Sequence, residues 1–420
     1  MSRARTGGVR EVCIRAAHVA SVMAGLSTAT KDACLGAMST ALCDRAAELI
    51  EANAADVDAA RSAGSSGAIV DRLTLTKERI DAMAGGLLAL VAQGDPAGEV
   101  VSSWRRPNGL LVQEVRAPLG VVAVIYEARP NVTADVAGLC LKSGNACVLR
   151  GSSSALRSNV ALAEVLSEAA QGAGAPPAAI QLIEDSGRDA ALELMRAKGL
   201  VDLLVPRGGR GLIQTIEEHA TVPFIIDGDG NCHVYVDRSA DQATATSIVV
   251  NAKTQRPGVC NAAETLVVHR DIADAWLPHA LDALDATGVE IRGDEAVCRL
   301  WAKALPATDE DWSTEYLGLV LAVKVVGSID EAIAHINRWG TSSAEAIVTA
   351  DTAAARRFTT EVDSGSVFVN ASTRFSDGGQ LGYGAEIGIS TQKLHARGPM
   401  GLRALTATKH VVWGDGQVRR

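Results

Sequence analysis

From residue 121 onward, short apolar runs alternate with amphipathic segments, and this alternation restricts the fold more than any other feature. The first apolar run, 121–126, is expected to be a buried strand, and 133–142 is expected to be a helix. The pattern repeats up to residue 226, with strands expected at 146–149, 180–183, 201–205 and 222–226 and helices at 154–171, 189–198 and 211–219. Such alternation predicts a parallel sheet with helices on its faces and ligands at the carboxyl ends of its strands.

Other segments divide the chain around this block. A turn-rich stretch, 227–231, is a candidate domain boundary, and a second alternating block runs roughly from Cys232 to Ile389. Strands are expected in the second block at 265–268, 318–325, 346–348 and 366–369. The Ala-rich stretch 8–62 and a segment from Thr76 to about Gly94 are expected to be helical. Two extended runs within 101–115 flank Pro107-Asn108-Gly109, which predicts a hairpin, and 404–413 is expected to be a further strand.

The composition excludes several classes of protein. Of the 420 residues, 47% are hydrophobic, as expected for a globular chain with a large core. The net charge of −9 and the lack of a long basic run argue against nucleic acid or an anionic membrane as the main partner. No apolar run approaches the ~20 residues of a membrane span. The eight cysteines form no CxxC pair and no zinc-like spacing, so we expect no metal site and a reducing cytoplasm.

Cys260 is the cysteine whose setting favours chemistry. It follows a Pro257-Gly258 break and precedes an apolar run, so it is expected on an exposed turn that enters a strand. A thiolate there could attack a carbonyl carbon. The alternative is an inert loop cysteine beside a core strand, and the local residues alone favour that alternative.

Three clusters of polar residues follow expected strands. Asn131 lies where its amide could stabilise an oxyanion, although helix capping is the more common role of such an asparagine. The Gly-rich turn 206–211 could expose backbone amides and two arginines to a phosphate, or it could be a plain tight turn. Arg150 and the serines after it could lie against a nucleotide, and the serines could equally cap the next helix.

Taken in order, these clusters resemble the aldehyde dehydrogenase superfamily and, within it, the gamma-glutamyl phosphate reductase family. The resemblance covers nearly the whole chain. The segments that carry it are Val124-Ile125-Tyr126-Glu127-Ala128-Arg129-Pro130-Asn131-Val132-Thr133, Lys142-Ser143-Gly144-Asn145 with Leu149-Arg150-Gly151, Val205-Pro206-Arg207-Gly208-Gly209, Asn231-Cys232-His233-Val234-Tyr235-Val236-Asp237 and Thr254-Gln255-Arg256-Pro257-Gly258-Val259-Cys260-Asn261-Ala262.

The resemblance implies a role for each matching residue. Cys260 corresponds to the thiol nucleophile, and Asn131 forms the oxyanion hole together with the Cys260 backbone amide. For the cofactor, Arg150 lies near the adenosine ribose, the segment 207–209 (Arg207, Gly208 and Gly209) is the phosphate loop, and Glu315 binds the nicotinamide ribose. Arg256 and Arg374 are candidate anchors for the substrate's phosphate and carboxylate, from their charge and position, and a surface role is as good an interpretation of Arg374.

The resemblance also implies an aldehyde dehydrogenase-like α/β fold with a Rossmann-type cofactor domain, an α/β catalytic domain and a small β oligomerisation element. We expect the cofactor domain at 1–100, 118–229 and 389–403, the catalytic domain at 230–388 and the oligomerisation element at 101–117 and 404–420. The implied reaction is NADPH-dependent reduction of L-glutamyl 5-phosphate to L-glutamate 5-semialdehyde and phosphate through a cysteine thioester, the second step of proline biosynthesis from glutamate. The implied enzyme is a cytoplasmic homo-oligomer. Glutamate 5-kinase could pass the substrate directly to it.

Two departures from the family pattern accompany the resemblance. Asp227 or its neighbours fall where hydrolytic relatives carry a water-activating glutamate, which suits an acyl-enzyme that water does not release. Ser343 and Ala344 replace a histidine and a hydroxyl residue that are usual in the family. An acylating dehydrogenase that uses coenzyme A, and a non-catalytic homologue that acts as a scaffold, are the alternatives.

Overall fold

The computed structural model describes residues 7–419, which form two compact units. The first unit contains the chain up to Ile226, together with Gly382–Gly388 and the residues from Met400 onward. The second unit contains Asp227–Leu381 and Ile389–Pro399. The change of unit after Ile226 coincides with the turn-rich stretch that marked a candidate boundary.

We expected residues 389–403 to belong to the cofactor domain as one segment, but the structure divides these residues between the two units. Residues 389–399 pack with the second unit because β14 (Ile389–Ser390) pairs antiparallel with β15 (Gly398–Pro399) and Ser390 forms a β-bridge with Asp227. The residues from Met400 onward return to the first unit, where the Met400 amide donates to the Gly388 carbonyl at 2.8 Å.

A four-stranded parallel sheet lies at the centre of the first unit, in the order β5-β4-β3-β6. The strands are β3 (Val121–Tyr126), β4 (Ala146–Gly151), β5 (Ile180–Leu182) and β6 (Leu203–Arg207). All six residues of β3 are buried, because the strand is apolar throughout and helices cover both of its faces. The predicted alternation of strands and helices is confirmed.

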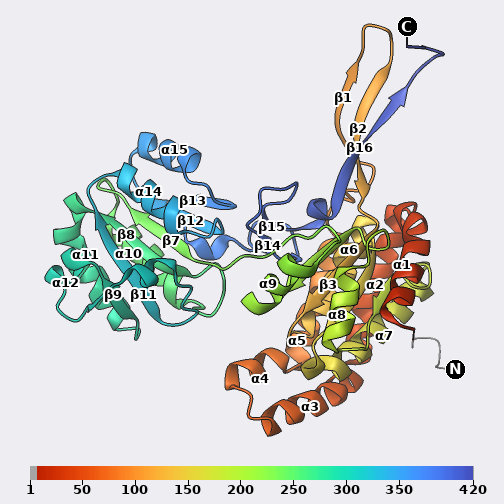
Figure 1. Cartoon of the computed structure of the whole chain (residues 1–420), viewed down its shortest axis with the longest axis horizontal. Helices are drawn as coiled ribbons and strands as arrows, with labels where there is room; N and C mark the ends of the chain where they lie inside the picture. Colours follow the sequence, from red (N-terminus) through yellow and green to blue (C-terminus); the bar gives the residue numbers. More distant parts are fainter. Residues whose placement is uncertain (1–6, 420) are drawn as a thin grey trace. The chain divides into compact units, whose positions relative to one another are not determined.

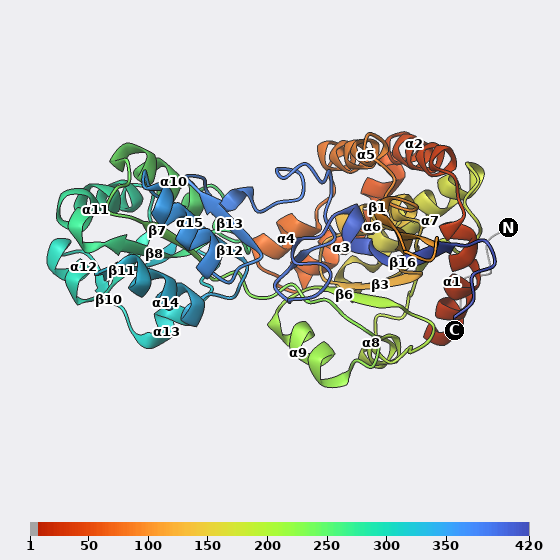
Figure 2. The ribbon, with the colours of Figure 1, turned by 90° about the horizontal axis from the view of Figure 1, so that it is seen from above.

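Helices surround this sheet in layers (Figure 2). On one side lie α6 (Asn131–Ser143) and α7 (Leu156–Gly172), and on the other lie α8 (Arg188–Met195) and α9 (Arg210–His219). The N-terminal helices are α1 (Val9–Ala24), α2 (Thr28–Asp44), α3 (Ala46–Ser62), α4 (Gly67–Leu73) and α5 (Lys77–Val91). Helices α2 and α5 pack outside α6 and α7 (Figure 2), so the predicted N-terminal helical layer is confirmed.

The expected strand at 222–226 is wrong. Only an isolated bridge joins Phe224 to Leu204 of β6. The Leu204 amide donates to the Pro223 carbonyl at 2.9 Å, and the Ile225 amide donates to the Leu204 carbonyl at 3.1 Å. Pro223 has no N–H to extend the ladder, so the apolar run stays irregular.

The second unit is built on a seven-stranded parallel sheet in the order β10-β9-β11-β8-β7-β12-β13. The four expected strands are present as β8 (Ala263–His269), β11 (Val320–Val326), β12 (Ala344–Val348) and β13 (Ser366–Val369). The sequence analysis missed the other three, which are β7 (Cys232–Val236), β9 (Glu290–Gly293) and β10 (Leu305–Pro306).

Helices cover both faces of this sheet (Figure 1), and each face has its own apolar core. Val234 and Leu266 point to the face covered by α10 (Gln242–Thr254), α11 (Arg270–Asp285) and α12 (Glu295–Leu300). Tyr235 and Val267, one residue further along, point to the face covered by α14 (Ile329–Trp339) and α15 (Thr352–Glu361). A short helix, α13 (Asp309–Ser313), precedes β11.

The predicted hairpin is confirmed as β1 (Val100–Arg105) and β2 (Leu111–Pro118). Strand β16 (Thr406–Trp413) pairs antiparallel with β2 along its whole length, so the three strands form one ribbon, drawn in orange and dark blue in Figure 1. The last strand starts later than residue 404 because 402–405 form a 3₁₀ turn. Within residues 7–419, no helix combines the length and the apolar character needed to cross a membrane.

Candidate functional site

Cys260 lies in the second unit, on the loop that joins α10 to β8. The loop closes as a turn in which the Ala262 amide donates to the Val259 carbonyl at 3.1 Å. Cys260 is half-buried, whereas five of the eight cysteines are buried. A partly accessible thiol on a tight turn is what a nucleophile needs, so the structure agrees with the predicted setting of Cys260.

Gly230 packs directly against the backbone of Cys260. A Cβ atom at position 230 would lie 1.9 Å from the Cys260 carbonyl oxygen and 2.4 Å from its Cα atom, so no larger residue fits without a shift of the backbone. The Cys232 thiol, buried at the start of β7, donates to the same carbonyl at 3.2 Å. The beginning of β7 therefore fixes the backbone that carries the nucleophile.

Glu315 approaches the same glycine from the loop between α13 and β11. Its Oε1 atom accepts a hydrogen bond from the Gly230 amide at 2.8 Å. Burial raises the pKa of Glu315, while the hydrogen bond from Gly230 opposes this shift. Two residues predicted for separate roles, Cys260 and Glu315, thus meet at one backbone position.

Arg374 belongs to the same region of the second unit and is half-buried. It lies in a 3₁₀ turn, Thr373–Phe375, and its Nε atom donates to Gln255 Oε1 at 2.9 Å. Burial lowers the pKa of Arg374, Arg256 lowers it further, and Cys260 raises it, so these charges are near one another. The turn is attached to the loop that carries Cys260, residues 255–262, here called the nucleophile loop. The attachment is a hydrogen bond that Thr373 Oγ1 donates to the Asn261 carbonyl at 2.8 Å.

Asn131 lies in the first unit, as the first residue of α6, and it does not cap the helix. The N-cap is Pro130, and no side chain bonds to the cap position. The exposed Asn131 side chain instead donates from Nδ2 to Asp135 Oδ2 at 3.0 Å. Burial raises the pKa of Asp135 to about 6, against the opposing effects of Asn131 and Arg207. The capping interpretation is therefore wrong, and the amide is held at the carboxyl end of β3 by Asp135.

Arg150 and Arg207 lie near the carboxyl ends of β4 and β6, the two strands that flank β3. The register pairs Tyr126 of β3 with Gly151 on one side and with Arg207 on the other, so these ends meet at one edge of the sheet. The Arg150 guanidinium donates to the carbonyl oxygens of Ser186 and of Gly187, the latter at 2.9 Å. Its buried Nε atom has no partner among the residues that the structure describes.

The predicted phosphate loop opens α9. Gly209 is the N-cap of this helix and has no side-chain cap, and no atom lies within 4 Å of a Cβ placed at Gly209 or Gly211. The Gly209 amide donates to Glu127 Oε2 at 3.1 Å, and a Cβ at Gly208 would lie 2.8 Å from the Glu127 carboxyl carbon. An open glycine turn at a helix N-terminus suits a phosphate. Arg150 lies near the end of β4 at the same edge of the sheet, so the residues at this edge fit a dinucleotide.

Sequence reasoning missed Glu127 as a site residue. It follows β3 directly, and its amide donates to the Arg207 carbonyl at 3.0 Å, so it bridges two strand ends. Its position in the same cluster as Asn131 was the signal that could have found it.

The match to a family model decides the assignment: the model of the aldehyde dehydrogenase family matches residues 1–297 and 303–411. The chain belongs to the aldehyde dehydrogenase family. The expected fold class and the expected oxidoreductase activity are therefore confirmed, and the family implies a nicotinamide cofactor.

Relatives of this aldehyde dehydrogenase match over nearly its full length. Gamma-glutamyl phosphate reductase of Heliobacterium modesticaldum is 55% identical over 405 residues, which are 96% of this chain and 97% of the relative. The enzyme of the same name from Thermobifida fusca is 56% identical over 411 residues, 98% of each chain. A crystal structure of gamma-glutamyl phosphate reductase from Thermotoga maritima is 45% identical, covers 99% of this chain and 100% of its own, and has a TM-score of 0.96.

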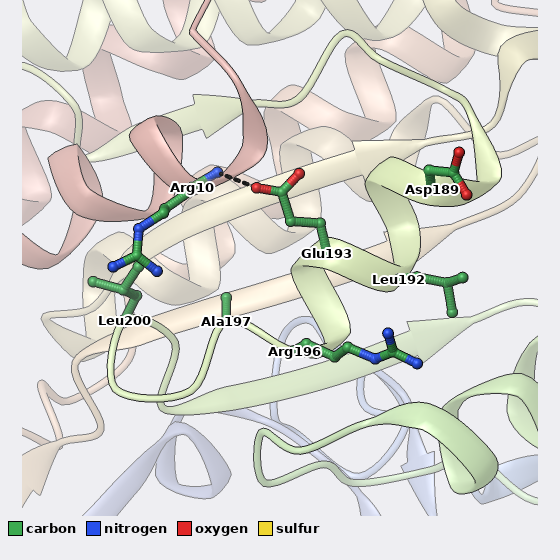
Figure 3. Close-up of a pocket in the computed structure, with 7 residues that line it drawn as sticks. All are labelled: Arg10, Asp189, Leu192, Glu193, Arg196, Ala197 and Leu200. Atoms are coloured by element: carbon green, nitrogen blue, oxygen red, sulfur yellow. Dashed lines mark hydrogen bonds between the residues drawn. The ribbon is translucent and has the colours of Figure 1, made fainter.

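The first unit of this aldehyde dehydrogenase also contains a cavity of about 400 Å³ (Figure 3). Its lining comes from α1, α8 and the segment after α8, namely Arg10, Asp189, Leu192, Glu193, Arg196, Ala197 and Leu200. None of the predicted site residues lines it. Among residues 7–419, no group of three or more His, Cys, Asp or Glu side chains could hold a metal ion.

Replacing Gly230 by alanine is expected to lower the kcat of this aldehyde dehydrogenase by roughly 100-fold, the usual cost of displacing a reacting group by about 1 Å. The reason is that the new methyl group must displace the Cys260 backbone. Steady-state kinetics at saturating substrate measures the effect. Gly86→Ala in α5 is the matched control, since no atom lies within 4 Å of its new Cβ, and it should keep full activity. A Gly230→Ala protein with the wild-type kcat would contradict the expectation.

Proposed function

We propose that this aldehyde dehydrogenase reduces L-glutamyl 5-phosphate to L-glutamate 5-semialdehyde and phosphate with NADPH, the second step of proline biosynthesis from glutamate. The observation that carries the proposal is the 55% to 56% identity, over nearly the whole chain, to relatives named gamma-glutamyl phosphate reductase. The half-buried Cys260 thiol on a fixed turn, beside Glu315, supports it independently.

In this proposal Cys260 performs the acyl transfer. Its thiolate attacks the acyl carbon of the substrate and forms a C–S bond, and the bond from that carbon to the phosphate oxygen then breaks. Phosphate leaves, and the glutamyl group remains on Cys260 as a thioester. The negative charge that develops on the carbonyl oxygen is stabilised by the Cys260 backbone amide and by the Asn131 side-chain amide, as the family resemblance implies.

The remaining predicted residues hold the cofactor and the substrate. NADPH, when bound, supplies the hydride that reduces the acyl carbon. Arg150 and the loop Arg207, Gly208 and Gly209 hold its adenosine and phosphate portions, and Glu315 binds the ribose next to the nicotinamide. Arg256 and Arg374 provide the positive charge for the phosphate and carboxylate of the substrate. The Cys260 thiolate is regenerated when the aldehyde leaves.

The identity of residue 227 supports phosphate release over hydrolysis. Hydrolytic relatives carry a glutamate near this position, as the resemblance implies. Here Asp227 forms a β-bridge with Ser390, so its backbone is part of the short β14 region. An aspartate in place of that glutamate suits a thioester that is reduced before water releases it, as the resemblance implies.

An assay in the reverse direction tests the proposed reaction. L-glutamate 5-semialdehyde and NADP⁺ are mixed with the purified chain, and the absorbance of NADPH is followed with phosphate or with coenzyme A as the acyl acceptor. We expect a rise that depends on phosphate. A rise only with coenzyme A would replace the proposed substrate by an acyl thioester, and no rise with either would favour a non-catalytic scaffold. Repeating the assay with NAD⁺ tests the preference for NADP.

We also propose that the β1-β2-β16 ribbon joins copies of this chain in a cytoplasmic homo-oligomer, to which glutamate 5-kinase could deliver the substrate directly. The ribbon exposes large apolar side chains, including Trp413, which is 61% exposed, and Trp104, which is 39% exposed.

Trp413→Asp is expected to raise the dissociation constant of the oligomer by roughly 30-fold or more, as for loss of an interface hot spot. Sedimentation velocity measures it, with Val22→Asp on α1 as the control for an exposed apolar residue elsewhere. An unchanged dissociation constant for Trp413→Asp would contradict the role of the ribbon.

A further inference from the structure

A fully buried ion pair joins the two residues that flank the nucleophile loop in the second unit. Lys253, near the end of α10, and Glu264, in β8, lie 11 residues apart on either side of Cys260. The Lys253 Nζ atom donates to Glu264 Oε2, and neither side chain is accessible to solvent. The pair therefore joins the helix that enters the loop to the strand that leaves it.

The second oxygen of Glu264 reaches the loop that carries Glu315. Glu264 Oε1 accepts a hydrogen bond from the Leu317 amide at 3.2 Å. Leu317 has a φ of 52°, a left-handed conformation that leucine rarely adopts and that its surroundings must therefore hold. The ring of Tyr316 in the same loop lies 5.8 Å from the Lys253 Nζ atom.

These contacts connect the buried ion pair to the backbone of Cys260. Glu264 holds Leu317, Glu315 holds the Gly230 amide, and Gly230 packs on the Cys260 backbone. The nucleophile loop also meets the Leu317 loop directly, since a Cβ at Gly258 would lie 3.7 Å from the Leu317 carbonyl oxygen.

Stability alone does not account for this pair. Two charges lose their hydration when they are buried, and apolar residues of similar volume commonly stabilise a fold as well or better. A buried pair placed between α10 and β8 with one spare carboxylate oxygen gives the Leu317 loop an acceptor that an apolar pair could not supply.

We propose that Lys253 and Glu264 are positioning residues that hold the 315–317 loop in the conformation in which Glu315 can bind the cofactor. Neither residue touches substrate or cofactor in this inference. Lys253 fixes the Glu264 carboxylate, Glu264 fixes the Leu317 amide, and the loop then presents Glu315 beside Cys260. The identity of the cofactor rests on the proposed function, whereas the ordering of the loop does not.

Two double variants separate the hydrogen bond from the buried charges. Both contain Lys253→Met, which removes the cation, and they differ only in Glu264→Gln or Glu264→Leu. Glutamine keeps an oxygen for the Leu317 amide, and leucine of similar size does not. Leu317 is 48% exposed, so its amide should exchange with solvent rapidly once the acceptor is lost.

Hydrogen exchange of the Leu317 amide, measured without cofactor, is the first readout. We expect slow exchange in the wild type and in the glutamine variant, and about ten-fold faster exchange in the leucine variant, the effect of losing one hydrogen bond. The second readout is NADPH binding by fluorescence titration and the KM for NADPH. The leucine variant should show a dissociation constant and a KM about ten-fold higher than the glutamine variant, with a smaller change in kcat.

Asp237→Asn is the control for a general loss of stability of the second unit. Asp237 is buried at the end of β7, where it accepts hydrogen bonds from Tyr235, Ser239 and Thr349, away from the Leu317 loop. The control should lower the melting temperature without changing the exchange of the Leu317 amide. Equal exchange and equal KM in the two double variants would overturn the inference.

The wild-type measurement decides the matter if a double variant does not fold, because rapid exchange of the wild-type Leu317 amide would also overturn the inference. Failure of the proposed reaction is a separate outcome. A wild-type chain that uses coenzyme A instead of phosphate would refute the proposed substrate and leave the exchange comparison unaffected.

Discussion

Replacing Cys260 by alanine is expected to lower kcat by at least ~10⁴-fold, because it removes the proposed nucleophile, and losses of this size follow removal of a covalent nucleophile. The half-buried thiol lies on a turn whose backbone is fixed by Gly230 and Cys232. Alanine keeps the backbone and removes only the sulfur. The fold and the affinity for NADPH should therefore stay near their wild-type values.

The reverse assay measures the loss, and quenched-flow mass spectrometry should detect a glutamyl adduct on the wild-type chain alone. Cys298→Ala is the matched control, since Cys298 is also half-buried in the second unit and its thiol donates to the Gly293 and Ala304 carbonyls. It should keep full activity. A Cys260→Ala protein that retained more than about 1% of wild-type turnover would refute covalent catalysis by this residue.

Replacing Asn131 by alanine is expected to lower kcat by about 10²- to 10³-fold, the usual effect of removing one donor of an oxyanion hole. The Asn131 amide is exposed at the first turn of α6 and is oriented by Asp135. Because the donor acts on charge that develops during the reaction, KM for the substrate should change much less than kcat.

The comparison of kcat with KM in the reverse assay separates this role from a structural one. Asn337→Ala is the control, since Asn337 in α14 is exposed and its Nδ2 atom also donates to a neighbour, the Glu361 carbonyl at 2.8 Å. It should leave both parameters unchanged. An Asn131→Ala protein whose KM rises while kcat is kept would show that Asn131 binds the ground state instead.

Much of the fold could be predicted because the buried strands of a parallel sheet are continuous apolar runs. The run at 121–126 is the exact extent of β3, and every residue in it is buried. The run at 222–226 is also apolar, but Pro223 removes a donor that a ladder needs, so apolar character alone predicted a strand that does not form. Strand β7 was missed because it follows the turn-rich stretch directly, with Cys232 and His233 among its five residues.

The candidate site could be predicted only as separate motifs. The residues at each strand end are close to one another in the sequence, so Asn131, Arg150 and Arg207 were found from the residues around them. The approach of Gly230 to Cys260 and the bond from Glu264 to Leu317 join segments that are distant along the chain. No spacing rule predicts such contacts, since the order of strands in the seven-stranded sheet creates them.

The ribbon has a consequence for the order in which the molecule is completed. Strand β2 is paired on one side by β1, its neighbour in sequence, and on the other by β16, where Trp413 Nε1 donates to Gln113 Oε1 across a separation of 300 residues. During synthesis, the hairpin emerges long before β16 and keeps one edge of β2 open until residues 406–413 have been translated. An open edge of this kind recruits foreign strands. Pairing with β16 then covers this edge, so β2 is protected only after residues 406–413 have joined the ribbon.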